Sequence, residues 1–209
     1  MTPTALLNRY MDDCPLIGII RGVTPGEVEA IGEAIFDSGI RIIEVPLNSP
    51  EPLQSISKLA AKFGDRALVG GGTVLEPEQV ATVKAVGGRL IVAPNTNVEV
   101  IAETAEAGLV SCPGYFTPSD AFDAIEAGAT ALKLFPAEGA APAVLKSQRA
   151  VIPRDVPIFV VGGVTPDSMQ AWLEAGADGF GLGGGLYQPG QSPAETSEKA
   201  RAYVAALKR

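Results

Sequence analysis

The residue most able to do chemistry in this chain is Lys133, because it stands inside the apolar run ALKLF, residues 131–135. A charged lysine is costly to bury and ordinarily stays in water. Burial favours the neutral amine and therefore lowers its pKa. A neutral amine attacks a ketone to form a Schiff base. The position of Lys133 indicates covalent catalysis on a keto compound, and a plain anion ligand is the alternative.

Glu44 is the second unusual residue. In the stretch RIIEVPLNSP, residues 41–50, it is the one acidic residue of the chain inside an apolar strand-like run. Two interpretations stay open. Glu44 and Lys133 form a buried ion pair that only stabilises the core, or the carboxyl moves protons while the lysine forms and releases a covalent intermediate. Both predict that the two side chains lie near each other.

The chain has no histidine, which excludes histidine-based triads and histidine proton shuttles. Its two cysteines, Cys14 and Cys112, have no metal-binding or disulfide spacing, and we expect buried thiols. A zinc site is improbable without imidazoles. We therefore expect neither a metal nor a cofactor.

Polar or conformationally special residues end several of the expected strands. Arg21 ends the first, Thr73 the third and Pro94 the fourth. The pair Gly162 and Gly163 closes the seventh, and residues 183–185, all glycine, close the eighth. Backbone N–H groups freed by glycine, next to a helix N-terminus, form a phosphate site. Tight turns without a ligand are the alternative.

Apolar, β-rich runs recur along the chain and alternate with segments of helical periodicity. The expected strands are 16–22, 41–47, 67–74, 90–95, 109–114, 131–136, 158–164 and 179–186. Near-continuous apolar strands separated by helices predict a parallel sheet covered on both faces. Eight such units predict an α/β fold of the (β/α)8 TIM-barrel class, as one domain over residues 1–209, with an open doubly wound sheet as the alternative.

Helix boundaries have local signals. Thr24 and Thr165 each precede a proline, which predicts a cap followed by a first helical turn. Glycines 39, 108, 128 and 176 are placed to end helices. Arg41 and Arg89 stand at strand beginnings, away from the end where barrels carry chemistry, so we expect them to be structural.

Composition limits the partners. The 209 residues carry a formal net charge of -8, so we expect no nucleic-acid partner. No apolar run approaches the roughly 18 residues of a membrane span, and no signal-peptide pattern opens the chain. We expect no membrane partner and a cytoplasmic location.

The segments IIEVPLNSP, GGTVLEPEQV, LIVAPNTN, ALKLFPA, VGGVTPDSM and GLGGGLY together resemble the 2-keto-3-deoxy-6-phosphogluconate and -galactonate aldolases. The resemblance runs over nearly the whole chain. It implies a metal-independent Schiff-base aldolase on a (β/α)8 barrel, generally trimeric. Such an enzyme cleaves a six-carbon phosphorylated keto-deoxy sugar acid to pyruvate and D-glyceraldehyde 3-phosphate. The expected partners are therefore this small-molecule substrate and two further copies of the chain.

Carried over by position, the resemblance implies that Lys133 forms the Schiff base and that Glu44 is the general acid and base. The implied substrate-binding residues are Arg21, Thr73, Pro94, Phe135, Val161, Gly162, Gly163, Gly183 and Gly184. Thr73 would orient the pyruvate part, with Pro94 and Phe135 packing around it, and the glycines would hold the phosphate. The family often has a serine where this chain has Gly184, so we expect no hydroxyl contact to the phosphate from this position.

Asn48 and Val161 point to one branch of the family. Gluconate-type enzymes usually have an arginine soon after the glutamate and a threonine before the strand-seven glycines, whereas this chain resembles the galactonate type at both places. We expect 2-dehydro-3-deoxy-6-phospho-D-galactonate as substrate. The gluconate epimer, 4-hydroxy-2-oxoglutarate, another phosphate-binding barrel enzyme such as an epimerase or synthase, and a non-catalytic phosphosugar-binding barrel are the alternatives.

Overall fold

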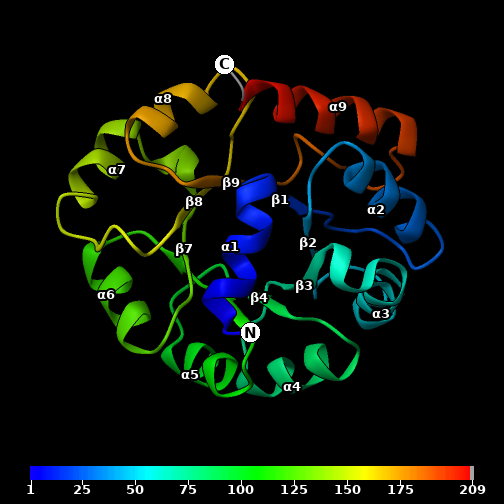
Figure 1. Ribbon diagram of the computed structural model, residues 1–209, viewed down its shortest axis with the longest axis horizontal. Coiled ribbons are helices and arrows are strands. Elements are labelled where there is room, and N and C mark those ends of the chain that lie inside the picture. Colours follow the sequence, from blue (N-terminus) through cyan, green and yellow to red (C-terminus); the bar gives the residue numbers. More distant parts are fainter. Residues whose placement is uncertain (208–209) are drawn as a thin grey trace.

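Strands and helices alternate along the chain, and the strands form a ring inside the helices (Figure 1). The computed structural model describes residues 1–207. The strands are β1 (Leu16–Ile19), β2 (Ile42–Pro46), β3 (Leu68–Gly72), β4 (Leu90–Val92), β5 (Val110–Cys112), β6 (Gly114–Tyr115), β7 (Leu132–Leu134), β8 (Ile158–Val161) and β9 (Gly179–Leu182). The helices are α1 (Pro3–Asp13), α2 (Val28–Asp37), α3 (Pro52–Phe63), α4 (Pro77–Ala85), α5 (Val98–Glu106), α6 (Pro118–Glu126), α7 (Pro142–Gln148), α8 (Met169–Glu174) and α9 (Pro193–Ala206), with 3-10 turns η1 (Gly64–Arg66) and η2 (Ala137–Gly139).

The sheet closes on itself through residues 110–115. The strand order is β5-β4-β3-β2-β1-β9-β8-β7-β6, and every neighbouring pair is parallel. The run expected as one strand is broken at Pro113, because proline has no N–H for the ladder. β5 pairs with β4 and β6 pairs with β7, so this run joins both ends of the sheet. The predicted (β/α)8 barrel is confirmed, and the open-sheet alternative is wrong.

Side chains alternate between two buried faces of the barrel wall. Ile43 belongs to the apolar layer between strands and helices, whereas its neighbour Ile42 points into the barrel interior. Both are fully buried. This double burial explains why the strands are continuous apolar runs rather than alternating ones. A charged residue on an inward position is consequently enclosed by the whole ring.

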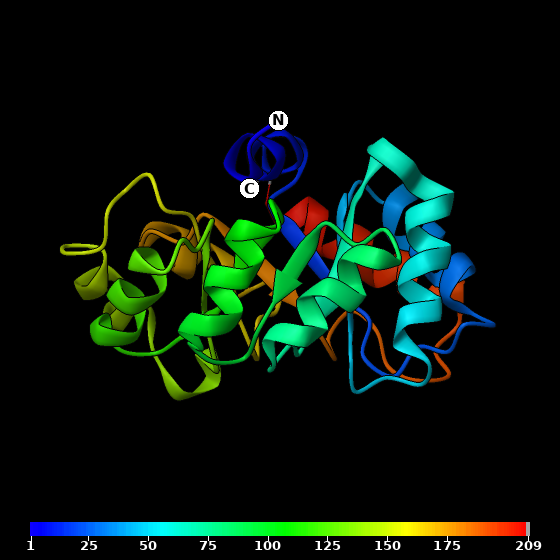
Figure 2. The ribbon, with the colours of Figure 1, turned by 90° about the horizontal axis from the view of Figure 1, so that it is seen from below.

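Helix α1 covers one end of the barrel (Figures 1 and 2). Its Leu7 and Tyr10 are buried with the inward side chains near the strand beginnings, including Leu68 and Leu90. Sequence reasoning did not anticipate this helix. With that end closed, the interior can be reached from the end where the strands finish. Within residues 1–207 no helix has both the length and the apolar character needed to cross a membrane.

The predicted helix ends are confirmed and two predicted helix starts are wrong. Gly39, Gly108, Gly128 and Gly176 all have positive φ just after a helix, the conformation that glycine adopts without strain. By contrast, α2 begins at Val28 and α8 at Met169, each four residues after the threonine cap that we expected. Thr24 and Thr165 instead begin turns, with their carbonyl oxygens accepting from Val28 and Ser168.

Candidate active site

Lys133 lies in the middle of β7 and points into the barrel. It is 6% exposed and is the buried lysine among residues 1–207. Its strand neighbours across the ladders are Gly114 on β6 and Phe159 on β8. Its Nζ lies 4.6 Å from the centroid of the Phe135 ring, near enough for a cation–π contact when the amine is protonated. The amine is therefore enclosed, with an aromatic face on one side.

Glu44 lies on β2, also facing inward, and is 1% exposed. Its carboxylate fills the space over Gly72 of the adjacent strand, where an added Cβ would lie 1.6 Å from Oε2. Oε2 has no hydrogen-bond partner in the described chain. Burial raises the pKa of the Glu44 carboxyl to about 7, while the charges of Lys133 and Arg21 oppose that rise. A buried carboxyl with a pKa near neutrality is suited to taking up and releasing protons.

Lys133 and Glu44 influence each other without direct contact. Burial lowers the pKa of the Lys133 amine, and the Glu44 charge partly offsets this. Among residues 1–207, however, the two side chains form no ion pair within 4.0 Å. A purely structural ion pair would require a contact between the Glu44 carboxylate and the Lys133 amine, and the structure does not have that contact. The arrangement is an amine shifted toward its neutral form beside a carboxyl shifted toward its protonated form.

Cys112, on β5, is a third inward group that sequence reasoning left out of the site. It is 1% exposed, and burial raises the pKa of its thiol to about 12, with Lys133 lowering and Glu44 raising that pKa. The sulfur is thus a neutral neighbour of both charged groups. Its only sequence signal was a cysteine in an apolar run, which is common in protein cores.

Arg21 joins the loops that follow β1, β2 and β3. Its guanidinium donates to Asn48 Oδ1 and, at 3.3 Å, to Thr73 Oγ1. Thr73 has a φ of 54°, a left-handed conformation that is strained for a β-branched residue. All three residues stand beyond the ends of their strands, although Arg21 and Thr73 were expected at strand ends. They form a polar rim at the end of the barrel where the strands finish.

A cavity of about 560 Å³ opens at this end, around β1, β7, β8 and β9. Of the residues expected in the site, those lining it are Arg21, Lys133, Phe135, Val161, Gly162, Gly163, Gly183 and Gly184. Glu44, Thr73 and Pro94 do not line it. Pro94 and Phe135 instead border a smaller adjoining cavity of about 300 Å³. The structure brings most of the expected residues together and leaves these three beside or behind the main cavity.

The four glycines expected to hold phosphate lie in two neighbouring turns. Gly162 and Gly163 have φ values of 112° and 63°, which require glycine. In the described part of the chain, no N–H of these four glycines donates to a protein acceptor. The expected helix N-terminus is absent, because α8 begins six residues after Gly163 and α9 nine residues after Gly184. The groups that these two turns themselves offer to an anion are therefore backbone N–H groups.

The cavity also contains residues that sequence reasoning missed. Glu138, from η2, and Tyr187, from the loop after β9, both line it. Tyr187 is 2% exposed, and its hydroxyl donates to Glu27 of the turn before α2. A glutamate in a loop and a tyrosine beyond a strand carry no distinctive pattern in sequence. The described residues hold no cluster of three histidine, cysteine, aspartate or glutamate side chains able to bind a metal ion.

Comparison with known proteins decides the family. The family model for KDPG and KHG aldolases matches residues 7–195. The chain belongs to the KDPG and KHG aldolase family. The "2-dehydro-3-deoxy-6-phosphogalactonate aldolase" of Escherichia coli (strain K12) is 47% identical over 200 residues, which are 96% of this chain and 98% of that protein. A solved structure described as "Native KDPGal structure" is similar with a TM-score of 0.92 and 47% identity, covering 93% of this chain and 94% of the other.

A gluconate-type relative is less similar. The "2-dehydro-3-deoxy-phosphogluconate aldolase" of Zymomonas mobilis subsp. mobilis (strain ATCC 31821 / ZM4 / CP4) is 31% identical over 170 residues, 80% of each chain. The predicted family is therefore confirmed, and the chain is more similar to the galactonate type of aldolase than to this gluconate-type member.

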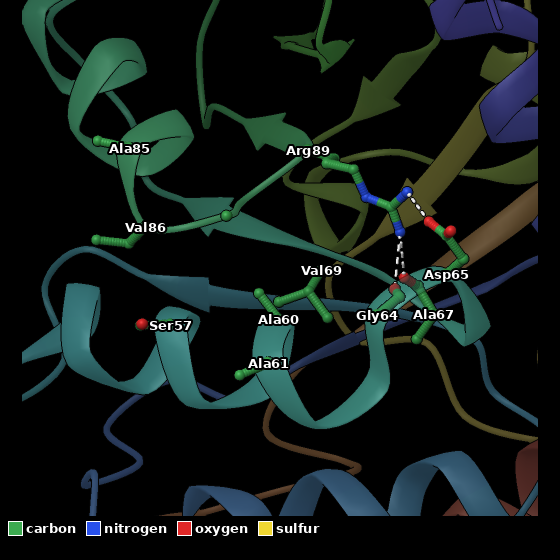
Figure 3. Close-up of a pocket in the computed structure, with 11 residues that line it drawn as sticks. Ser57, Ala60, Ala61, Gly64, Asp65, Ala67, Val69, Ala85, Val86 and Arg89 are labelled. Carbon is green, nitrogen blue, oxygen red and sulfur yellow. Dashed lines mark hydrogen bonds and ion pairs between the residues drawn. The ribbon is translucent and has the colours of Figure 1, made fainter.

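This aldolase has another hollow, of about 460 Å³, between α3 and the turn before β4 (Figure 3). Small side chains line it, with Arg89 at one end. Arg89 donates to Asp65 Oδ1 at 2.9 Å and to the carbonyl oxygens of Gly64 and Ala67. The guanidinium is thus occupied by protein acceptors at the strand-beginning end, as expected for a structural arginine. The hollow is remote in the fold from Lys133.

We predict that activity of this aldolase falls as the pH decreases through about 7, because the Glu44 carboxyl, with its pKa raised to about 7, is protonated below that pH and cannot act as a base. The measurement is kcat/KM against pH. The variant Glu44→Gln should lose this acidic limb and retain on the order of 10⁻² to 10⁻⁴ of the activity. Glu106→Gln, an exposed change at the end of α5, is the matched control. An unchanged limb in Glu44→Gln would show that another group titrates.

Proposed function

We propose that this protein is a Schiff-base aldolase that cleaves 2-dehydro-3-deoxy-6-phospho-D-galactonate to pyruvate and D-glyceraldehyde 3-phosphate. The observation that carries the proposal is the lysine at 6% exposure, whose amine has a lowered pKa, at the floor of an open cavity. The 47% identity to a galactonate-type aldolase over nearly the whole chain supports the choice of substrate.

Lys133 begins the reaction in this proposal. Its neutral amine attacks C2 of the keto acid, and loss of water from the carbinolamine gives an iminium. Glu44, through a water, takes the proton of the C4 hydroxyl, the C4 oxygen becomes the aldehyde oxygen, and the iminium draws in the electron pair of the C3–C4 bond as that bond breaks. Glyceraldehyde 3-phosphate then leaves, the enamine takes a proton at C3, and hydrolysis frees pyruvate and the amine. In the reverse reaction, the cavity would hold the enamine and glyceraldehyde 3-phosphate close together, which favours formation of the C3–C4 bond.

Glu44 transfers the protons in this proposal. Its carboxyl, with a pKa near 7, accepts a proton at one step and returns it at another without a large energetic cost. Glu44 does not line the cavity, so a water molecule is the expected carrier between the carboxyl and the substrate. Phe135 packs beside the amine and excludes bulk water from that side.

The two ends of the substrate bind at different places. Arg21 lines the cavity and, together with Thr73, forms a cationic and hydroxyl-bearing rim suited to the C1 carboxylate. The free N–H groups of residues 162–163 and 183–184 suit the phosphate at C6. Val161, which is 6% exposed in the cavity wall, offers no hydrogen bond to a substrate hydroxyl. This apolar contact is our proposed contribution of Val161 to the choice of epimer.

Trapping with borohydride tests the role of Lys133. We expect that reduction in the presence of pyruvate will attach a reduced pyruvyl group to the peptide that contains Lys133, and will inactivate the enzyme. Peptide mass spectrometry locates the adduct. The variant Lys133→Met should give no adduct and no activity, whereas Lys146→Met, at an exposed position in α7, should behave as wild type. An adduct on another lysine would overturn the mechanism.

The relative rates on two epimers test the substrate. Pyruvate release, followed by coupling to lactate dehydrogenase, should be at least about tenfold faster, as kcat/KM, for the galactonate epimer than for the gluconate epimer, a difference of roughly 1.4 kcal/mol in transition-state binding. Faster cleavage of the gluconate epimer or of 4-hydroxy-2-oxoglutarate would contradict the assignment while leaving the aldolase chemistry intact.

We also propose, from the family resemblance, that three copies of the chain assemble into a homotrimer. Its expected mass in solution is three times the 21.5 kDa of one chain. Sedimentation equilibrium over a range of protein concentrations measures that mass, and a stable monomer or dimer would refute the proposal.

A further inference from the structure

Glu138 lies against the two glycines that we assign to the phosphate. It belongs to η2, the turn that follows β7, and it lines the same cavity as Lys133. An added Cβ on Gly162 would lie 2.1 Å from Glu138 Oε2, and one on Gly163 would lie 2.6 Å from its Cγ. The carboxylate therefore covers the surface of this turn. In this conformation it fills part of the space that a phosphate bound to these glycines would need.

Little in the protein holds the Glu138 carboxylate in place. Among the described residues, 1–207, it accepts no hydrogen bond and no lysine or arginine lies within 4.0 Å of it. The residue is exposed at the cavity mouth. The side chain can consequently rotate away from the glycines without breaking a polar contact. Moving the side chain would lose its packing on the turn of Gly162 and Gly163 and the attraction between its negative charge and the N–H groups there.

We propose that Glu138 sets the affinity of the site for phosphate, because its carboxylate competes with the substrate phosphate for the turn of Gly162 and Gly163. This inference rests on the proposed function, because that function places phosphate at this turn. Two like charges at about 4 Å repel each other even in a water-like medium. The carboxylate must therefore swing outward when a phosphate dianion binds, and its negative charge weakens that binding. The same repulsion favours release of the phosphorylated product, glyceraldehyde 3-phosphate.

The variant Glu138→Gln tests this inference, since it keeps the shape of the side chain and removes its charge. The probe is glycerol 3-phosphate, a stable molecule with the charged end of the cleaved product, titrated by calorimetry. We expect Glu138→Gln to bind it about fivefold more tightly than wild type, the factor that corresponds to about 1 kcal/mol of relieved repulsion. Glu106→Gln makes the same change of charge at an exposed position remote from the cavity and should bind as wild type.

A second readout separates charge from damage to the fold. Exchange of the pyruvate methyl protons needs Lys133 but no phosphate, so its rate should be the same in Glu138→Gln and wild type. Unchanged or weaker binding of glycerol 3-phosphate by Glu138→Gln, or slower exchange, would overturn the role of Glu138 and leave the proposed function standing. Failure of wild type itself to bind glycerol 3-phosphate and to exchange pyruvate protons would overturn the proposed function instead.

Discussion

The enclosure of an amine and a carboxyl in one barrel interior is the constraint on which the rest of this structure depends. Raising the pKa of Glu44 from 4.5 to about 7 costs roughly 3 kcal/mol of folding stability above about pH 7, and the cost disappears below about pH 4.5. That is a large part of the free energy of unfolding of a typical native protein, which is about 5–15 kcal/mol. The continuous apolar strands and the α1 cover offset it, because they bury both faces of the wall and one open end.

The glycines of β3 follow from the same constraint. Gly72 leaves the volume that the Glu44 carboxylate fills, and an added Cβ on Gly70 would lie 1.9 Å from the Leu90 carbonyl oxygen of the next strand. Neither residue has a positive φ, so side-chain volume, not backbone conformation, requires glycine there. Gly162 and Gly163 differ, because their left-handed backbone forms the turn itself. Glycine thus serves two separate needs in this site: room for a buried acid, and a left-handed turn whose N–H groups have no protein acceptor.

Sequence reasoning could find the fold because the strands follow the apolar pattern of a parallel sheet that is buried on both faces. It could find Lys133 and Glu44 because they are the charged exceptions in that pattern. A lysine and a glutamate in apolar runs are costly exceptions, and their burial at 6% and 1% agrees with that reading. Boundaries were less accessible. Sequence reasoning did not expect a break at Pro113 in the strand 109–114, and the Thr165 cap signal instead begins a turn before α8. Glu138 could not be found at all. An exposed glutamate in a turn is ordinary in sequence, and only its position over Gly162 distinguishes it.

The two ends of the barrel divide stability and function between them. At the strand-beginning end, Arg149 is 8% exposed and donates to the carbonyl oxygens of Gly176 and Val156 and to Asp178, whose carboxylate also accepts from the N–H of Ile158. Such contacts satisfy backbone groups that would otherwise be buried unpaired. At the other end, by contrast, Thr73 is strained and glycine N–H groups are left without partners. A protein can retain strained and unpaired groups where ligands bind because well-satisfied contacts elsewhere maintain the fold. Satisfied polar contacts therefore gather at the end where the strands begin, and strained or unpaired groups at the end where they finish.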